Sequence, residues 1–231
     1  MRLLLDESNS VTWRTTSFCK VLAFLALAMK PVHHGDRDRP LVALTFDACP
    51  TSLDLDLGIV DVLREHEVPA TMFLSGRWVE RHRRETVELA QHFEIGNHGY
   101  AHDDARQGKM SYGEALQDID RAQKVIEKVT GARPRFYRPP AVRYNDEILR
   151  AARDAGLKTV LYDVASGDPD PRLKPEKIVR YVLWKSKPGS IVIFHVNGKG
   201  WTTAETLPRI IDGLRSRGLR LVTVGDLLSR G

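Results

Sequence analysis

Three short segments of this sequence carry side chains suited to acid–base or metal chemistry. Asp47 ends the apolar run LVALTFD, His98 and His102 lie in GNHGYAHDD, and His195 ends the apolar run IVIFH. An apolar run that ends in a polar residue is typical of a buried strand with that residue at its tip. Two histidines four residues apart are a common pair of metal ligands. These segments predict a site in which a carboxylate meets a metal ion held by histidines.

The histidine pair is informative because of its surroundings. In a helix, the spacing of four would put the His98 and His102 imidazoles on one face, although such pairs also arise often by chance. The pair follows a strand candidate and precedes Asp103 and Asp104. These aspartates either hydrogen-bond the imidazoles from behind or begin the following helix. We therefore predict that His98 and His102 bind a metal ion.

Three other residues have both an ordinary and a functional interpretation. A histidine at the end of a very apolar run, such as His195, is either a hydrogen-bonded core residue or an active-site acid or base. Asp168 in SGDPDP is either a turn residue or part of a site, and Arg138 in FYRPP is either a surface residue or part of a site. Taken singly, each residue favours the ordinary interpretation.

The elements that must position these residues alternate between strand-like and helix-like patterns. The strand candidates are residues 42–46, 70–74, 93–95, 135–137, 159–164, 190–195 and 220–224. Helical stripes cover residues 55–66, 78–92, 112–130, 145–155, 175–187 and 204–217. This alternation predicts one α/β domain with a parallel sheet or barrel. Since the loops after parallel strands converge on one face, the candidate residues are expected at the carboxyl ends of the strands.

Composition is that of an ordinary globular protein. The 231 residues are 42% hydrophobic and 28% charged, which is enough chain to bury a core in one domain. The net charge of +5 comes from lysines and arginines scattered through helical patterns, so we expect no nucleic-acid partner. Two cysteines, Cys19 and Cys49, define no disulfide framework.

Residues 1–40 are predicted to be a leader and linker before a domain of residues 41–231. The apolar run VLAFLALAM is too short to span a bilayer but has the length of a signal-peptide core. Lys20 precedes the run, whereas Asp6 and Glu7 are unusual in a signal peptide. We expect a periplasmic or secreted protein with no stable membrane span. A tethering helix or a cytoplasmic protein are the alternatives.

Five segments, in this order, resemble the polysaccharide deacetylases that share the NodB-homology domain, also called carbohydrate esterase family four. TFDACP is similar to the first motif of the family, HGYAH to the second, RPP to the third, SGDP to the fourth and IVIFH to the fifth. Because the set is ordered and extends from Leu41 to the C-terminus, it is far more specific than any one motif. The resemblance implies a distorted (β/α)7 barrel of the NodB-homology type.

The resemblance also implies a role for each matching residue. Asp47 would be the general base for the attacking water, and His98 and His102 would hold a divalent metal, zinc in the first place. His195 would be the general acid that protonates the leaving amine. Asp168 would orient His195 and stabilise its charge.

Three further positions match residues around the family's reacting groups. Arg138 would pair with Asp47 and keep it ionised. Ile193 would form the apolar wall for the acetyl methyl group. The backbone N–H of Ala141 would donate to the developing oxyanion.

The first motif departs from the family at Ala48, where the family has a second aspartate that binds the metal. Alanine offers no ligand, and three alternatives stay open. Asp47 itself binds the metal, a nearby carboxylate reaches in, or water fills the position. The nearby carboxylates are Asp54, Asp56, Asp103 and Asp104.

Other departures concern the walls of the site and one thiol. Pro169 and the Ala141–Val142 pair stand where the family has tryptophan and an aromatic or glycine pair, which puts the substrate in question more than the reaction. Cys49 is either a nucleophile or a small residue that packs the strand end. Packing is favoured, because no asparagine or second acid completes a cysteine–histidine site.

We expect a metal-dependent hydrolase that removes N-acetyl groups from amino sugars of a polysaccharide or oligosaccharide. One alternative is a small-molecule or cyclic amide hydrolase on the same fold. The other is a carbohydrate-binding domain that has lost turnover with the second aspartate. His195, Asp168 and Arg138 argue against the last alternative, because a binding domain has no need of a proton donor and the groups that orient it.

Overall fold

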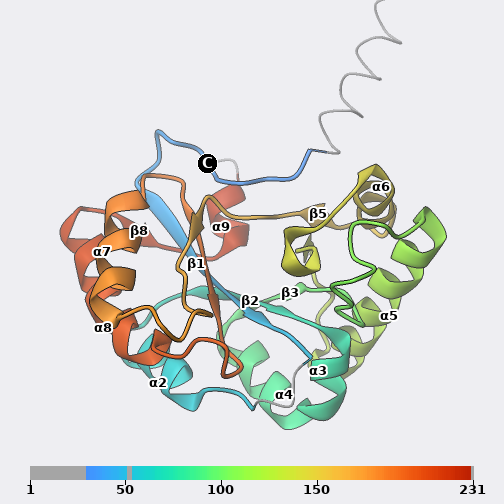
Figure 1. The fold of residues 1–231 in the computed structure, drawn as a ribbon, viewed down its shortest axis with the longest axis horizontal. Helices are drawn as coiled ribbons and strands as arrows, with labels where there is room; N and C mark the ends of the chain where they lie inside the picture. The colour runs from blue at the N-terminus through green and yellow to red at the C-terminus, as the bar shows by residue number, and fades with distance from the viewer. Residues whose placement is uncertain (1–29, 51–53, 230–231) are drawn as a thin grey trace, which may run out of the picture.

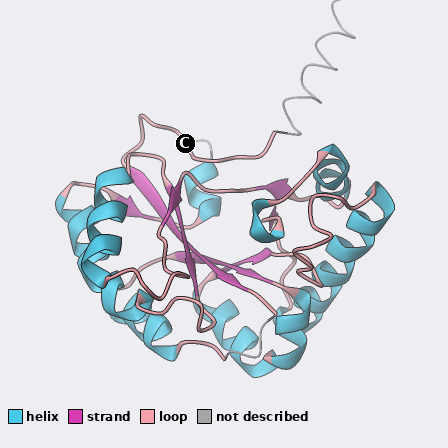
Figure 2. Ribbon diagram, viewed as in Figure 1, coloured by secondary structure: helices cyan, strands magenta, loops and turns pink. Residues whose placement is uncertain are grey.

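The central strand of the fold is β1, Leu41–Ala48, whose eight residues are all buried. In this computed structural model, which describes residues 30–50 and 54–229, β1 pairs in parallel with β2 on one side and β7 on the other. The strand order is β5-β4-β3-β2-β1-β7-β6, with β8 also paired to β1. The sheet is curled into a half-barrel with helices around its outside (Figures 1 and 2).

Short parallel strands complete this sheet. In chain order they are β2 Ala70–Leu74, β3 Glu94–Asn97, β4 Phe136–Tyr137, β5 Lys158–Thr159, β6 Val164–Ala165, β7 Ile191–His195 and β8 Arg220–Leu221. The α/β class agrees with the sequence prediction, and the predicted distorted (β/α)7 barrel is present as a curled half-barrel.

Helices follow most strands and cover the outer face of the sheet. They are α2 Leu57–Glu65, α3 Gly76–Arg81, α4 Arg83–His92, α5 Tyr112–Thr130, α6 Asp146–Asp154, α7 Pro175–Lys185, α8 Thr203–Ser216 and α9 Val224–Leu228, with a 3-10 turn at Pro140–Val142. Local sequence explains their limits. Ser111 and Glu114 form a capping box at the start of α5, and Gly131, with a φ of 74°, ends it.

The two faces of β1 separate core residues from site residues. Successive side chains of a strand point to opposite faces. Leu44, Phe46 and Ala48 lie in the main hydrophobic cluster. Thr45 and Asp47 lie on the other face, where both contact Arg138. The sheet therefore buries one side of β1 in the core and directs the other side to the interior of the half-barrel.

The register of the sheet brings distant segments together. Asp47 on β1 is the direct partner of His195 on β7. His98 follows the last residue of β3, and Arg138 follows the last residue of β4. The prediction that polar residues gather at the carboxyl ends of the strands is confirmed.

Three predicted elements were wrong in extent. The strand expected at 159–164 is two separate strands, because Val160 pairs with Val32 and the Leu161 carbonyl accepts a hydrogen bond from Arg138. The helix expected at 78–92 breaks at His82 into α3 and α4. The strand expected at 220–224 ends at Leu221, and α9 begins soon after it.

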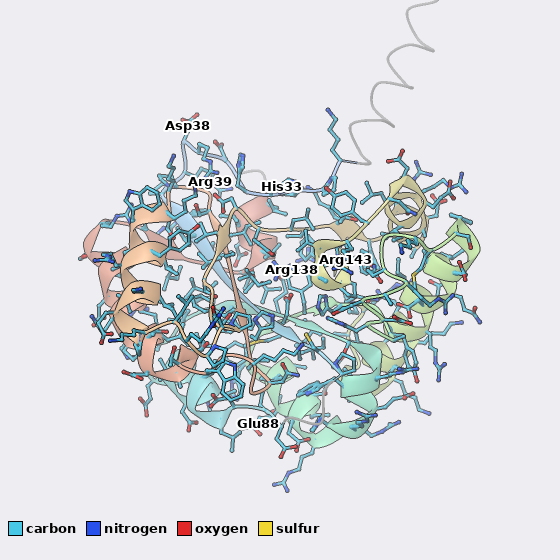
Figure 3. All side chains as sticks on the ribbon, in the orientation of Figure 1. His33, Asp38, Arg39, Glu88, Arg138 and Arg143 are labelled. Atoms are coloured by element: carbon cyan, nitrogen blue, oxygen red, sulfur yellow. The ribbon has the colours of Figure 1, made fainter. Side chains whose placement is uncertain are left out.

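Residues 1–29, which include the predicted leader, lie outside the described residues. Within the predicted linker, Val32 and His34 form isolated bridges with Val160 and Ser190. Figure 3 shows His33 on this segment at the rim of the domain and Arg138 inside it. None of the helices in the described part of the chain has the length and apolarity needed to cross a membrane.

Candidate active site

A hollow of about 260 Å³ lies at the carboxyl ends of the strands. The predicted residues that line it are Asp47, His98, His102, Ala141, Asp168, Ile193 and His195. Arg138, the remaining predicted residue, is fully buried and lies against Asp47. The structure therefore brings all the predicted residues into one place.

Asp47 and Arg138 form a buried ion pair at the floor of this hollow. The Arg138 Nη1 donates to Asp47 Oδ1 at 2.7 Å and to Thr45 Oγ1 at 3.0 Å. Its Nη2 donates to the Leu161 carbonyl at 3.2 Å. Burial by itself raises the pKa of Asp47, but the Arg138 guanidinium that donates to this carboxylate outweighs burial and holds that pKa below its usual value. Asp47 is an ionised carboxylate at neutral pH.

His195 is held by Asp168 through two contacts. The His195 Nδ1–H donates to Asp168 Oδ1 at 3.1 Å, and the His195 backbone N–H donates to Asp168 Oδ2 at 2.7 Å. Ser166 and Thr203 donate their hydroxyls to the same carboxylate, each at 2.8 Å. Asp168 is thus a fully hydrogen-bonded anion, and the Nε2 of His195 is left toward the hollow.

His98 and His102 lie in a loop after β3, not in a helix as the spacing allowed. Gly99 and His102 have φ values of 70° and 50°, which turn the chain sharply. The two rings meet edge to face, with centroids 4.9 Å apart. A left-handed backbone at a residue other than glycine is strained, and such strain is common at functional sites. The pair meets because of this turn, and helical periodicity plays no part.

The protonation of His98 follows from its hydrogen bonds. Its Nδ1 lies 2.8 Å from the Arg138 carbonyl oxygen, which only accepts, so the proton is on Nδ1. Burial lowers the pKa of His98 to about 3, so the ring is neutral at neutral pH. The Nε2 lone pair then faces Asp47 Oδ2 at 3.5 Å. Two electron-rich atoms facing each other in a buried site favour a cation between or beside them.

Three of the four carboxylates considered as replacement metal ligands either make other hydrogen bonds or are exposed. Asp56 caps the start of α2, Asp103 accepts backbone N–H groups of the next turn, and Asp54 is exposed. Asp104 lines the hollow, and its Oδ1 lies 3.0 Å from His102 Nδ1. It contacts the Nδ1 of His102, which agrees with the first of the two interpretations of Asp104.

A sulfur atom belongs to the group of candidate metal ligands. Cys49, His98 and His102 bring one ligand atom each to within 4.8 Å of one another. From the sequence, Cys49 was predicted to be either a nucleophile or a packing residue. Strand alternation was the missed signal, since residues 47 and 49 share a face of the chain and residue 48 does not. Burial raises the pKa of the Cys49 thiol to about 12, which argues against a free nucleophilic thiolate.

Two further features of the wall were not apparent from sequence. Lys199 lines the hollow together with Cys49. Ala141 and Val142 both have left-handed backbones, with φ values of 51° and 55°. A strained turn therefore presents Ala141 to the hollow beside the histidines.

Comparison with known proteins agrees with this geometry. Residues 34–160 match the family model described as polysaccharide deacetylase. The chain is 35% identical over 195 residues to a peptidoglycan-N-acetylglucosamine deacetylase of Bacillus cereus, covering 81% of this chain and 88% of that protein. It is 29% identical over 208 residues to the uncharacterized protein YlxY of Bacillus subtilis, covering 88% of this chain but only 62% of that protein. The chain belongs to the polysaccharide deacetylase family.

A solved structure adds a comparison at the level of the fold. BA3943 of Bacillus anthracis, described as a CE4 family pseudoenzyme, matches with a TM-score of 0.78 and 28% identity, covering 87% of this chain and 69% of that one. A mutant of BA3943 is described as having restored enzymatic activity. The predicted family and fold are confirmed. The family also includes a pseudoenzyme. Whether this chain turns over substrate therefore depends on the catalytic and metal-binding residues that it has itself.

Proposed function

We propose that this chain hydrolyses the N-acetyl group of an amino sugar in a glycan, with peptidoglycan as the first candidate substrate. The observation that carries the proposal is the pairing of Asp47 with His195 on neighbouring strands, each held by its own buried partner. The deacetylase of Bacillus cereus that resembles this chain supports peptidoglycan as the substrate to test first.

Asp47 and His195 divide the proton transfers. Amide hydrolysis needs a base to take a proton from water and an acid to protonate a poor leaving amine. Asp47, kept ionised by Arg138, is the base. His195 is the acid, and Asp168 holds its Nδ1–H so that Nε2 carries the proton that is given to the amine. The two groups are on adjacent strands, so one substrate amide can reach both.

A divalent metal, zinc in the first place, is held by His98 and His102. The fit is supported by the Nε2 of His98, whose lone pair faces a carboxylate oxygen in a buried site. When bound, the ion supplies Lewis acidity to the reaction. The neutral state of both imidazoles suits them as ligands, since burial lowers the pKa of His102 as well.

The acetyl group has a defined wall in this proposal. Ile193 is buried on β7, two residues before His195, and therefore shares its face of the strand. It contacts the acetyl methyl group. The backbone N–H of Ala141, on the strained turn across the hollow, donates to the developing oxyanion.

Residues 41–231 are the catalytic domain in this proposal, and residues 1–40 are a leader and linker. The apolar run at 21–29 supports export, which would bring the enzyme to a periplasmic or extracellular glycan. Detection of the full-length chain, with Met1 retained, in the cytosolic fraction would contradict export.

The activity is tested by acetate release from N-acetylated peptidoglycan and chitin oligomers by the zinc-loaded protein. We expect release by the wild type and loss of release in folded His195→Ala. Equal rates in both proteins would refute the mechanism. Hydrolysis of small cyclic amides in place of glycans would identify the alternative hydrolase. Glycan binding without acetate release would identify a binding domain of the pseudoenzyme kind.

A further inference from the structure

We propose that Cys49 supplies the third protein ligand of the metal site. The chain would then bind its ion with a cysteine and two histidines in place of the aspartate and two histidines that its family resemblance implies. This inference rests on the proposed metal-binding function. It assigns a role to Cys49, a residue that the acid–base mechanism does not use.

Side chains at the end of β1 alternate between the hydrophobic core and the hollow. Ala48 is fully buried in the main hydrophobic cluster, so its position faces the helices. Asp47, one residue earlier, faces the hollow, and Cys49, one residue later, faces it again. After Asp47, Cys49 is therefore the next side chain of this segment that enters the site.

The distances between the candidate ligand atoms are close to those of a zinc site. The ligand atoms of Cys49, His98 and His102 all lie within 4.8 Å of one another. Zinc bonds of about 2.0 to 2.3 Å in a tetrahedral site separate neighbouring ligand atoms by roughly 3.5 Å. Small side-chain rotations are enough to close the difference, and Cys49 and His98 are already buried.

Both histidines are oriented for binding through Nε2. The Nδ1–H of His98 donates to the Arg138 carbonyl oxygen at 2.8 Å. The Nδ1 of His102 lies 3.0 Å from Asp104 Oδ1, a contact that favours a proton on Nδ1. Metal-binding histidines are held in this way by a carbonyl or carboxylate behind the ring. The outer contacts of a metal site are therefore present around the two imidazoles.

A thiolate at this position is also matched by its surroundings. Lys199 lines the same hollow as Cys49, and its positive charge offsets the negative charge of a thiolate. Asp47 remains paired with Arg138, so the ion does not have to take the carboxylate that acts as base. A sulfur ligand favours zinc and cobalt over magnesium and manganese. We therefore expect a site that selects the softer ions.

Cobalt(II), added alone to the metal-free full-length protein, tests the inference. We expect the near-ultraviolet absorption of a cobalt–thiolate bond, with one ion bound per chain. Cys49→Ser should lose this absorption and bind zinc more weakly. Cys19→Ser is the matched control and should keep both. Circular dichroism of each variant shows whether it is folded, and Cys49→Asp should bind the ion without the absorption.

The outcomes separate this inference from the proposed function. Cobalt bound without the thiolate absorption, or an absorption that survives in Cys49→Ser, would overturn the role of Cys49. Acetate release is measured on the same samples. Thiolate absorption without acetate release would support the inference and refute the deacetylase proposal. Acetate release by a protein without that absorption would do the reverse.

Discussion

The site has a proton-donor half around His195 and a metal half around His98, and the two differ in how well their polar atoms are hydrogen-bonded within the protein. In the proton-donor half, Asp168 receives hydrogen bonds from Ser166, Thr203 and His195. In the metal half, the Nε2 of a neutral His98 faces a carboxylate oxygen at 3.5 Å. In the first half, every polar atom just named has a hydrogen-bond partner. In the second half, two hydrogen-bond acceptors face each other without a donor between them. This difference fits the proposal that His195 transfers a proton and that His98 and His102 bind a cation.

The largest effect is expected when the proton-donor half is broken. Asp168→Asn leaves the shape of the residue but removes the charge behind His195, so kcat should fall on the order of 100-fold to 10,000-fold. Zinc content should not change, because Asp168 contacts none of the proposed ligands. Asp170→Asn, in the same loop but paired with exposed Arg172, is the control. A loss of zinc in Asp168→Asn would show that the two halves are not separate.

Loss of the buried cation between the halves should act on stability. Arg138→Met leaves Asp47 buried and unpaired, which should lower the free energy of unfolding by about 3 to 5 kcal/mol. Urea denaturation of the metal-free protein measures this. Arg84→Met is the control, since Arg84 is exposed and should change stability by no more than about 0.5 kcal/mol. Similar losses in both variants would show that the ion pair has no special weight.

The pH dependence of stability should follow the metal half. The pKa of His98 is about 3 in the folded protein against 6.5 when unperturbed. Between these values the unfolded chain binds more protons, so the metal-free protein should lose stability as pH falls from 6.5 toward 3. Asp47, whose pKa is also lowered, adds the same sign at the acid end.

Denaturant midpoints measured across this pH range test the effect. His98→Gln should flatten the dependence, because glutamine does not titrate. His33→Gln, at an exposed position of the rim, should leave it as it is. An unchanged slope in His98→Gln would mean that other groups carry the pH dependence.

The smallest effect is expected at the outer contact of the metal half. Asp104→Asn weakens the hold on the His102 ring, so zinc affinity should fall about 10-fold to 100-fold. Asp103→Asn, whose carboxylate only caps a turn, should change affinity much less. Equal affinities for Asp104→Asn and the wild type, measured by competition with a chelator, would show that this contact does not orient His102.

Much of the fold was predictable because periodicity is local. The α5 range was predicted without error, since its capping box and its terminal glycine are adjacent in sequence. The strand expected at 159–164 was wrong, because Val160 and Leu161 are engaged by Val32 and Arg138 from elsewhere in the chain. No local pattern contains those partners.

The sequence by itself determined the alternation of strands and helices, the acid at the tip of β1 and the histidine at the tip of β7, because these follow from short-range hydrophobic patterns. Only the tertiary structure decided which atoms meet. It buried Arg138 under Asp47 and brought the sulfur of Cys49 to two histidines about 50 residues away. Sheet register and two left-handed turns, which depend on the whole packed domain, decided those contacts.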